Sequence, residues 1–310
     1  MTAIEVAGLV KQFKQQRALD GLSFSVPTGS TFGFLGPNGS GKTTTIRILL
    51  GLARPDAGTA SVLGLDALAH PNQVHPQIGF VPDVPSFYPW MTAPQYLRFS
   101  ASLFQLDART TDRRVGLLLE LAGLTGVRTP IGGYSRGMKQ RLGIVQALIN
   151  APRLLILDEP TSALDPMGRH DVLTLLAGLR QATTVFFSTH ILGDVERVCD
   201  QVAILAAGRV VAAEPTRQLR ARYGGAQRVL LELAEAPVPL ADALRGEPWL
   251  TGLRADRDRW ILEVADLAAA QHRLPGIIAA HGWGLRRMEP FEATLEEAFV
   301  RLIASGEQAS

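Results

Sequence analysis

Short apolar segments in the first part of the chain follow the pattern of β-strands. Apolar and polar side chains alternate in residues 22–26, and residues 31–35 are apolar almost throughout, as expected of a buried strand. The expected strands are residues 4–10, 18–26, 31–35, 60–63 and 77–82. From residue 45 to 50 the apolar positions recur at helical spacing instead. The pattern predicts a β-rich N-terminal part that contains one helix.

The middle of the chain changes first to helices and then back to strands. Residues 92–149 carry apolar stripes at helical spacing, with three helices expected from residue 92, over 114–124 and over 137–149. Apolar strands follow at 154–157, 184–188 and 202–205, and Gly208 marks a closing hairpin. Strands that alternate with helices indicate a mostly parallel sheet. We therefore expect an α/β fold with an N-terminal antiparallel β-subdomain and a helical insertion.

The last part of the chain differs in pattern and composition. Three of the four tryptophans lie here, and we expect them in a core. Expected strands are 228–233, 249–253 and 260–264, and expected helices are 265–280 and 294–303. A Tyr-Gly-Gly-Ala segment near residue 223 marks the boundary. The sequence predicts a first domain at 1–222, with its helical subdomain at about 84–149, and a small α+β domain at 226–310.

The segment between the strand 31–35 and the following helix has the most specific chemistry in the chain. It fits the phosphate-binding pattern G-x-x-x-x-G-K-[ST], and its residues are Gly36, Pro37, Asn38, Gly39, Ser40, Gly41, Lys42, Thr43 and Thr44. A glycine-rich turn at a helix N-terminus directs backbone N–H groups at an anion. Lys42 supplies a compact charge for the β- and γ-phosphates, and the Thr43 hydroxyl is a Mg²⁺ ligand. The fold class is therefore a P-loop NTPase.

Polar residues follow two of the later strands at the points where each strand ends. Asp158 comes directly after the strand 154–157, at the edge where parallel sheets bind ligands, and is expected to hold the metal. Glu159 points elsewhere, towards the γ-phosphate, and is the candidate general base. His190 ends the strand 184–188, where a neutral imidazole can hydrogen-bond the γ-phosphate or the attacking water. Together these residues predict nucleotide hydrolysis.

Composition excludes several other classes of protein. A length of 310 residues allows two domains, and a net charge of +2 argues against a nucleic-acid partner. The single cysteine, Cys199, excludes an internal disulfide and is expected to be a small buried side chain. No apolar run approaches 18 residues, and the N-terminus lacks the features of a signal peptide. We expect a peripheral protein on the cytoplasmic side of the cell membrane.

The order of the motifs resembles the ATP-binding subunit of ABC transporters, in which a helical insertion and a signature segment separate the phosphate loop from Asp-Glu and a histidine. The segment Tyr134-Ser135-Arg136-Gly137-Met138 is similar to the family signature Leu-Ser-Gly-Gly-Gln at Ser135 and Gly137. The variant resembles the exporter branch with separate permease subunits. Ser135 and the N–H groups at the helix start near Gly137 form a second anion site. The resemblance implies a head-to-tail homodimer that holds two ATP, with Mg²⁺, between the two kinds of site.

The resemblance also assigns roles to residues outside these motifs. Phe13 occupies the position of an aromatic that stacks on adenine, unless it is a core residue, and Asp165 ends a segment that communicates across the dimer. Asp83 replaces the usual glutamine and is shorter and acceptor-only. It can still bind the metal through water, but it adds negative charge beside the γ-phosphate, so we expect either slower hydrolysis or a rearranged metal shell. The segment 84–91 is expected to expose aromatic residues to the permease.

The sequence therefore predicts the ATPase subunit of an ABC exporter, docked beneath a separate membrane permease. One alternative is an ABC-type ATPase that acts on ribosomes or DNA, but the chain has one cassette, no long coiled coil and no basic stripe. A second alternative is a regulatory module that binds ATP and turns it over slowly. The presence of Asp83 supports this alternative. The transported substrate is not encoded here, because specificity lies in the permease.

Overall fold

The computed structural model describes residues 1–180, 182–223, 227–234, 240–256 and 259–291. The chain divides into two compact units, Met1–Thr216 and Arg217–Ser310, so the division falls earlier than the boundary expected from the sequence. The helix expected at 294–303 lies outside the described residues. No helix among the described residues is long and apolar enough to cross a membrane.

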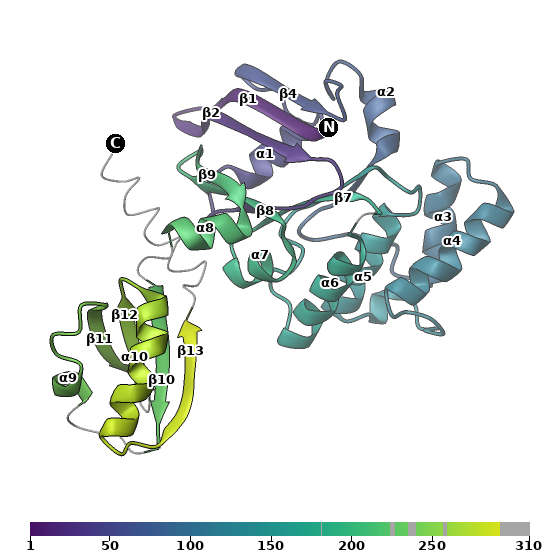
Figure 1. The fold of residues 1–310 in the computed structure, drawn as a ribbon. Helices are drawn as coiled ribbons and strands as arrows, with labels where there is room; N and C mark the ends of the chain where they lie inside the picture. The colour runs from purple at the N-terminus through teal and green to yellow at the C-terminus, as the bar shows by residue number, and fades with distance from the viewer. Residues whose placement is uncertain (181, 224–226, 235–239, 257–258, 292–310) are drawn as a thin grey trace. The chain divides into compact units, whose positions relative to one another are not determined.

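The first unit is built around a six-stranded sheet with the order β5-β6-β7-β3-β8-β9 (Figure 1). Its strands are β3 (Thr31–Leu35), β5 (Ile78–Val81), β6 (Leu154–Leu157), β7 (Thr184–Thr189), β8 (Gln201–Ala206) and β9 (Arg209–Pro215). All pairs are parallel except β8–β9, whose turn contains Gly208 at φ 78°. Every residue of β3, β6 and β7 is buried, as expected of central parallel strands. The mostly parallel sheet and its closing hairpin are confirmed.

A second, antiparallel sheet of the first unit has the order β2-β1-β4. Its strands and the adjoining helix are β1 (Thr2–Phe13), β2 (Gln16–Pro27), β4 (Ala57–Val62) and α1 (Lys42–Leu49). Helix α1 contributes Ile46 and Leu49 to the core that the two sheets share. Phe24 of β2 stacks on Phe32 and on Phe186, with ring centroids 6.0 Å apart in each pair. The N-terminal β-subdomain is confirmed.

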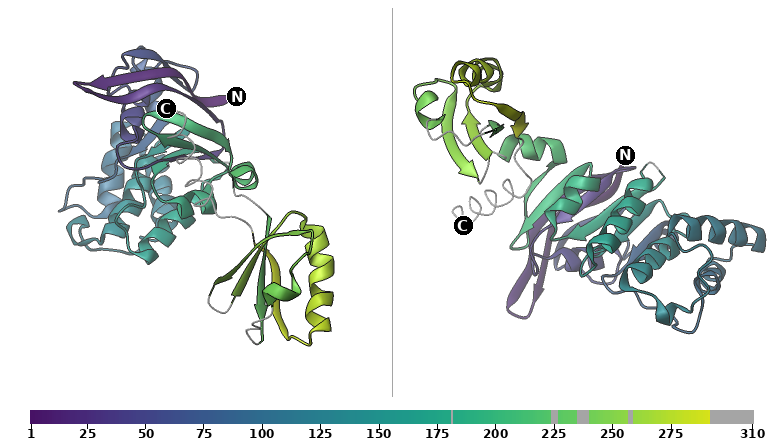
Figure 2. Two further views of the ribbon diagram at one scale, coloured as in Figure 1. Left: turned by 90° about the vertical axis from the view of Figure 1, so that its left-hand side faces the viewer. Right: turned by 90° about the horizontal axis from the view of Figure 1, so that it is seen from below.

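The other helices of the first unit lie before and after β6 in the sequence. They are α2 (Pro71–Val74), η1 (His75–Gln77), α3 (Ala93–Leu103), α4 (Ala108–Leu121), η2 (Ile131–Gly133), α5 (Arg136–Ala147), α6 (Pro166–Gly178) and α7 (Leu192–Val198). Helices α3, α4 and α5 form the predicted insertion, and Figure 2 shows it (blue-green) on a different side of this unit from the purple N-terminal strands. Asp107, Ser135 and Asp165 each cap a helix by accepting a backbone N–H bond.

Cys199 directly follows α7 and is 7% exposed, as the sequence predicts. Burial, together with the neighbouring carboxylates of Asp200 and Asp194, raises the pKa of the Cys199 thiol well above its usual value. Its Sγ atom packs so close to Gly33 of β3 that a Cβ there would lie 2.9 Å from it. Cys199 is therefore a core side chain.

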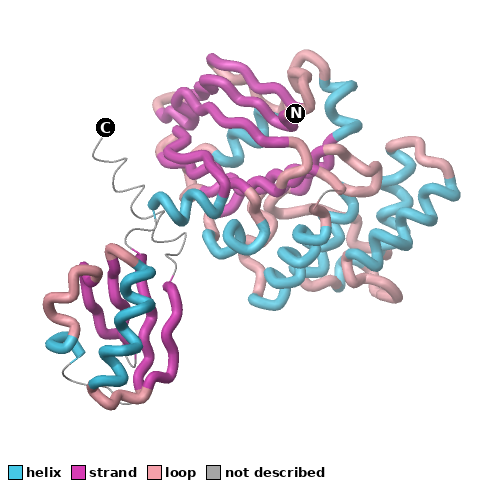
Figure 3. Tube along the Cα trace, in the orientation of Figure 1, coloured by secondary structure: helices cyan, strands magenta, loops and turns pink. Residues whose placement is uncertain are grey.

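The second unit is an antiparallel sheet packed against a helix (Figure 3). Its elements are α8 (Thr216–Tyr223, which contains the division between the units), β10 (Gln227–Leu233), α9 (Leu240–Ala243), β11 (Leu250–Asp256), β12 (Arg259–Val264), α10 (Leu267–Ala280) and β13 (Leu285–Phe291). Trp249 is 3% exposed in its core, and Trp260 and Trp283 pack against that core. The α+β class and the tryptophan prediction are confirmed, whereas β13 was not predicted.

Candidate functional site

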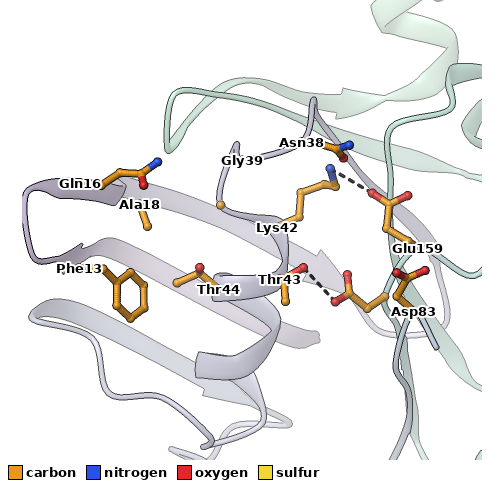
Figure 4. A pocket seen from close by; sticks show the side chains of 12 residues that line it. Phe13, Gln16, Ala18, Asn38, Gly39, Lys42, Thr43, Thr44, Asp83 and Glu159 are labelled. Carbon is orange, nitrogen blue, oxygen red and sulfur yellow. Dashed lines mark hydrogen bonds and ion pairs between the residues drawn. The ribbon is translucent and has the colours of Figure 1, made fainter. Parts of the chain in front are cut away.

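A cavity of about 380 Å³ opens where the phosphate loop faces the carboxyl ends of β5 and β6 (Figure 4). It is lined by Phe13, Gln16, Ala18, Asn38, Gly39, Gly41, Lys42, Thr43, Thr44, Asp83, Asp158 and Glu159. Residues from four separate stretches of the sequence therefore meet in one place. Gln16 and Ala18 of β2 were not predicted as site residues, because nothing in their local sequence distinguishes them from other strand positions.

The loop that joins β3 to α1 has the backbone geometry that an anion site needs. A Cβ on Gly36 would lie 2.6 Å from Ser40 Oγ, and a Cβ on Gly41 would lie 2.7 Å from the carbonyl oxygen of Ala18. Gly41 also has a φ of 105°, which only glycine adopts readily. Ser40 Oγ is buried without a hydrogen-bond partner among the described residues. A buried hydroxyl without a partner beside a helix N-terminus fits a bound phosphate oxygen.

Lys42 is the first residue of α1 and is 6% exposed. Its Nζ donates to the carbonyl oxygens of Gly36, at 2.6 Å, and Pro37, at 3.1 Å. The same Nζ lies 3.1 Å from Glu159 Oε1, and the two side chains are drawn together in Figure 4. Among the described residues, the only charged partner of this buried ammonium group is a carboxylate that an incoming anion can replace.

Asp158, 6% exposed, receives two hydroxyl hydrogen bonds. Thr43 Oγ1 donates to its Oδ2 at 3.0 Å, and Ser188 Oγ donates to its Oδ1 at 2.6 Å. Ser188 also accepts a bond of 2.9 Å from the backbone N–H of Glu159, so one hydroxyl orients both acidic residues. Ser188 was not predicted as part of the site, although it directly precedes Thr189 and His190 in the strand that was singled out.

Glu159 lies between two basic groups and on an unusual backbone. Its φ of 49° is in the left-handed region, where a non-glycine residue carries strain that clusters at functional sites. Besides Lys42, the carboxylate binds His190, whose Nδ1 lies 2.8 Å from Glu159 Oε2. His190 is 43% exposed, so its ring is partly open to solvent. The geometry places an acceptor carboxylate beside both the cation and an imidazole.

Asp83 lines the same cavity and makes a short hydrogen bond. Ser162 Oγ donates to Asp83 Oδ1 at 2.5 Å. Among the described residues, no group of three or more His, Cys, Asp or Glu side chains is arranged to hold a metal. Thr43 Oγ1 and Asp158 Oδ2, 3.0 Å apart, supply the hydroxyl and carboxylate oxygens that Mg²⁺ takes when its other ligands are water and phosphate. The donor set therefore fits Mg²⁺ bound together with a nucleotide.

Seven predicted site residues do not line this cavity. Four of them adjoin residues that do, namely Gly36, Pro37, Ser40 and His190, and the other three are at the N-terminal ends of helices α5 and α6. Ser135 caps α5 and accepts a bond of 3.2 Å from the backbone N–H of Met138. Asp165 caps α6 in the same way, and Gly137 packs so closely that a Cβ there would lie 3.4 Å from Gly168 Cα. All three are described residues, and none of them lines the cavity. Within one chain, the predicted signature segment and the phosphate loop are separate.

A model of the ABC transporter family matches residues 19–162 of the chain. The chain is also 35% identical over 302 residues to an uncharacterized ABC transporter ATP-binding protein, YxlF of Bacillus subtilis, covering 97% of this chain and 99% of that protein. The chain belongs to the ABC transporter ATP-binding proteins. Its site is thus that of a family that binds ATP with Mg²⁺ and hydrolyses it.

Two further comparisons support the same membership. This ABC ATP-binding protein is 33% identical over 308 residues to the bacitracin transport ATP-binding protein BcrA of Bacillus licheniformis, covering 98% of each chain. A solved ATP-binding subunit of an ABC transporter matches its fold with a TM-score of 0.64 at 33% identity, over 72% of this chain and 93% of that one. ABC ATP-binding subunits dimerise and act with membrane permeases.

Proposed function

We propose that this protein is the ATPase subunit of an exporter. It hydrolyses ATP in a head-to-tail dimer and drives transport through a separate permease, which holds it at the cytoplasmic face of the membrane. The observation that carries the proposal is the position of Glu159, whose carboxylate lies between Lys42 and His190 beside the Thr43–Asp158 pair. The similarity to a bacitracin transport protein supports transport as the purpose of the hydrolysis.

The residues of the site divide the reaction between them. When ATP binds, the ion pair of Lys42 with Glu159 is replaced by contacts of Lys42 with the β- and γ-phosphates, because the phosphates carry more negative charge than one carboxylate. Glu159, released from Lys42, accepts a proton from the attacking water, and His190 holds that water or the γ-phosphate in position. Mg²⁺, when bound through Thr43 and Asp158, neutralises phosphate charge. Ser188 keeps Asp158 and Glu159 in their orientations through its two hydrogen bonds.

The separation of Ser135, Gly137 and Asp165 from the cavity supports the dimer. Ser135 is the N-cap of α5, so the first N–H groups of this helix and the serine hydroxyl form an exposed anion site. We propose that this site binds the γ-phosphate of the ATP held by the partner's phosphate loop. Asp165, at the start of α6, then lies at the contact between the two protomers. A head-to-tail pair gives each ATP one half-site from each chain.

Substitution of Phe13 tests the proposal that its ring stacks on adenine. Its ring is 50% exposed at the end of β1 and lines the cavity, with Lys11 Nζ 5.4 Å from the ring centroid. Phe13→Ala is expected to weaken ATP binding about tenfold, because stacking of one base on an aromatic ring contributes about 1–3 kcal/mol. Phe13→Tyr should bind ATP as the wild type does. Calorimetric titration with tripolyphosphate, which lacks adenine, is the control, and an equal loss for both ligands would contradict stacking.

The segment 84–91 and the first turns of α3 form a cluster of aromatic side chains on the surface. Tyr88 lies 5.2 Å from Trp90 and 5.6 Å from Phe99, measured between ring centroids, and Trp90 is 69% exposed. Val84 is also exposed, at 66%. An exposed apolar patch of this kind marks a site of protein interaction. We propose that this aromatic cluster receives the permease.

Substitution of the aromatic cluster is expected to separate the protein from its permease. The double variant Tyr88→Ala and Trp90→Ala should lose at least about tenfold in permease recovered by co-purification from membranes, because aromatic anchors dominate interfaces. Its melting temperature should stay close to that of the wild type, since exposed side chains contribute little to stability. Leu285→Ala, a change of an exposed apolar residue in the second unit, is the matched control. Equal recovery of the permease by both proteins would exclude this contact.

Asp83 favours the second candidate function, a regulatory ATP-binding subunit with slow turnover. Together with Asp158 and Glu159 it gives the cavity three carboxylates, and Lys42 is the cation on the same wall. The added negative charge opposes the charge that develops on the γ-phosphate. Phosphate release by the purified chain with its permease separates the candidates, because an exporter subunit turns over at about 1 s⁻¹ or faster, as typical enzymes do.

A further inference from the structure

The second unit contains a cavity of about 340 Å³ on its antiparallel sheet, a volume within the range of small-molecule sites. Its described lining consists of Arg228, Gly252, Leu253, Arg254, Ile261 and Glu263. None of these six residues lines the nucleotide cavity, and none has a part in the proposed function. The cavity is therefore a candidate site of its own.

This cavity lies on the face of the sheet that is opposite helix α10. Leu262 and Val264 of β12 pack in the core together with α10, which Figure 1 draws across the sheet. Side chains alternate between the two faces of a strand, so Ile261 and Glu263 point to the opposite face. Both of these residues line the cavity.

The cross-strand neighbours of Ile261 and Glu263 complete the lining. Glu263 is directly opposite Arg228 of β10 on one side and Gly252 of β11 on the other. Ile261 is directly opposite Arg254 of β11. Residues that are directly opposite each other have their side chains on the same face of a sheet. Two guanidinium groups therefore share one face with an apolar side chain and a carboxylate.

Gly252 keeps this part of the sheet hollow. A Cβ at this position would lie 3.0 Å from Glu263 Oε2 and 3.4 Å from Glu263 Cβ, so a side chain here would crowd the glutamate. Glycine inside a strand often marks a place where a ligand approaches closely. The space of the cavity therefore depends on the missing side chain at position 252.

The charges of the lining favour an anionic ligand. Arg228 is 9% exposed, and its Nε lies 3.5 Å from Glu263 Oε1, farther than the about 2.7–2.9 Å of a direct hydrogen bond between charged groups. An oxyanion can therefore approach Arg228 without displacing a close contact to Glu263. Arg254 is exposed and, among the residues that the structure describes, forms no ion pair with a carboxylate.

We propose that this cavity binds a small organic carboxylate. Its carboxylate group lies at the guanidinium groups of Arg228 and Arg254, and its apolar body lies against Ile261. Guanidinium groups suit this ligand because their planar fork of N–H donors matches the two oxygens of a carboxylate. The site goes beyond the proposed function and does not depend on it.

The net charge of the lining favours a carboxylate over a phosphate. Two arginines and one glutamate give the described lining a net charge of +1, which one carboxylate neutralises. A phosphate group carries about 1.5 to 2 negative charges at neutral pH and would leave an excess of negative charge beside Glu263. The apolar side chain of Ile261 further favours an organic ligand over an inorganic anion.

Titration of the isotope-labelled full chain with isovalerate, followed by NMR at the backbone amides of Gly252 and Glu263, tests the proposal. Isovalerate joins a carboxylate to a branched alkyl group, and saturable binding is expected with a dissociation constant of about 1 mM, within the affinity per atom that small ligands reach. Isoamyl alcohol has the same body without the charge and should bind at least about tenfold more weakly, as should inorganic phosphate. These two signals report on the second unit, so the result is independent of the nucleotide site.

Three substitutions locate the ligand within the cavity. Arg254→Ala should weaken isovalerate binding about tenfold, the loss expected for a hydrogen bond between charged groups. Gly252→Val should weaken it as well, because the new side chain fills the hollow beside Glu263. Glu263→Gln should strengthen it, because the carboxylate that repels the anion is removed.

Arg245→Ala is the matched control, since Arg245 belongs to the same unit, is 80% exposed and does not line the cavity. It should bind isovalerate as the wild type does. Arg254 is substituted in preference to the buried Arg228, because the loss of one partner of a buried ion pair destabilises the fold. Thermal unfolding of each variant checks that the second unit stays folded.

Several results would overturn the proposal. One is the absence of any saturable change at Gly252 and Glu263 when isovalerate is added to the folded wild type. Another is an affinity that stays the same in Arg254→Ala and in Gly252→Val, which would place the binding elsewhere. Weaker binding in Glu263→Gln would show that the site takes a ligand with a positive group, and phosphate binding as tight as that of isovalerate would refute the assignment to a carboxylate.

Discussion

Glu159→Gln is expected to lower the rate of ATP hydrolysis by about 10²–10⁴-fold, the usual contribution of a general base. Glutamine has nearly the shape of glutamate but cannot take a proton from water. ATP binding should tighten, because Lys42 Nζ, 3.1 Å from Glu159 Oε1 in the free protein, loses the carboxylate that competes with the phosphates. Phosphate release and calorimetric titration of ATP measure the two effects. Unchanged hydrolysis in this variant would remove Glu159 from the role of base.

The same variant tests the dimer. Because ATP binds and is not consumed, the solution mass by light scattering should double with Mg²⁺ and ATP and stay monomeric without them. Ser135→Arg in the Glu159→Gln background is the matched control, since a large cation at the cap of α5 blocks the second anion site. It should abolish the doubling while one chain still binds ATP at its own phosphate loop. A mass that never doubles although ATP binds would contradict the two-half-site arrangement.

Lys42→Ala is expected to weaken ATP binding by about 100-fold or more, because it removes several hydrogen bonds between charged groups at once. It also leaves Glu159, 13% exposed, without its nearest cation, so the melting temperature of the free protein should fall. Fluorescence titration with a labelled ATP analogue and thermal unfolding measure the two effects.

Lys42→Arg distinguishes the shape of the cation from its charge. The ammonium group of Lys42 fits between the carbonyl oxygens of Gly36 and Pro37, at 2.6 and 3.1 Å. A planar guanidinium group is too wide for that position, so the arginine variant should recover little of the lost affinity. ATP binding by this variant equal to that of the wild type would show that charge alone matters, contrary to the compact-charge interpretation of the loop.

Local sequence patterns predicted those elements whose residues are neighbours in the chain. The strand 31–35 and the phosphate loop depend on glycines, a buried apolar run and a helix start within one short segment, so their structure follows from local geometry. Helix α6 was not predicted, although its buried residues Val172, Leu173, Leu175 and Leu176 recur at helical spacing. Strand β13 was missed because Arg286, Arg287 and Glu289 interrupt its apolar positions.

The partners of the site residues could not be predicted in the same way. Ser188 and Ser162 are ordinary serines in the sequence, and each acquires its significance from a carboxylate far away in the chain: Asp158 for Ser188 and Asp83 for Ser162. Serine hydroxyls bond whichever acceptor lies within reach, so residue type carries little information about them. The roles assigned to the site residues stay predictions until the experiments above are made.

The sequence by itself determined the family, the phosphate loop and the identities of the acidic residues, because these depend on residue types at short spacing. Tertiary structure alone decided the strand order β6-β7-β3, which inserts β7 between the strand of Asp158 and the strand of the phosphate loop. For that reason Ser188 of β7 orients Asp158, and His190 after β7 meets Glu159. Strand order depends on how whole faces of helices and sheets bury each other, and this non-local packing leaves no mark at any single position.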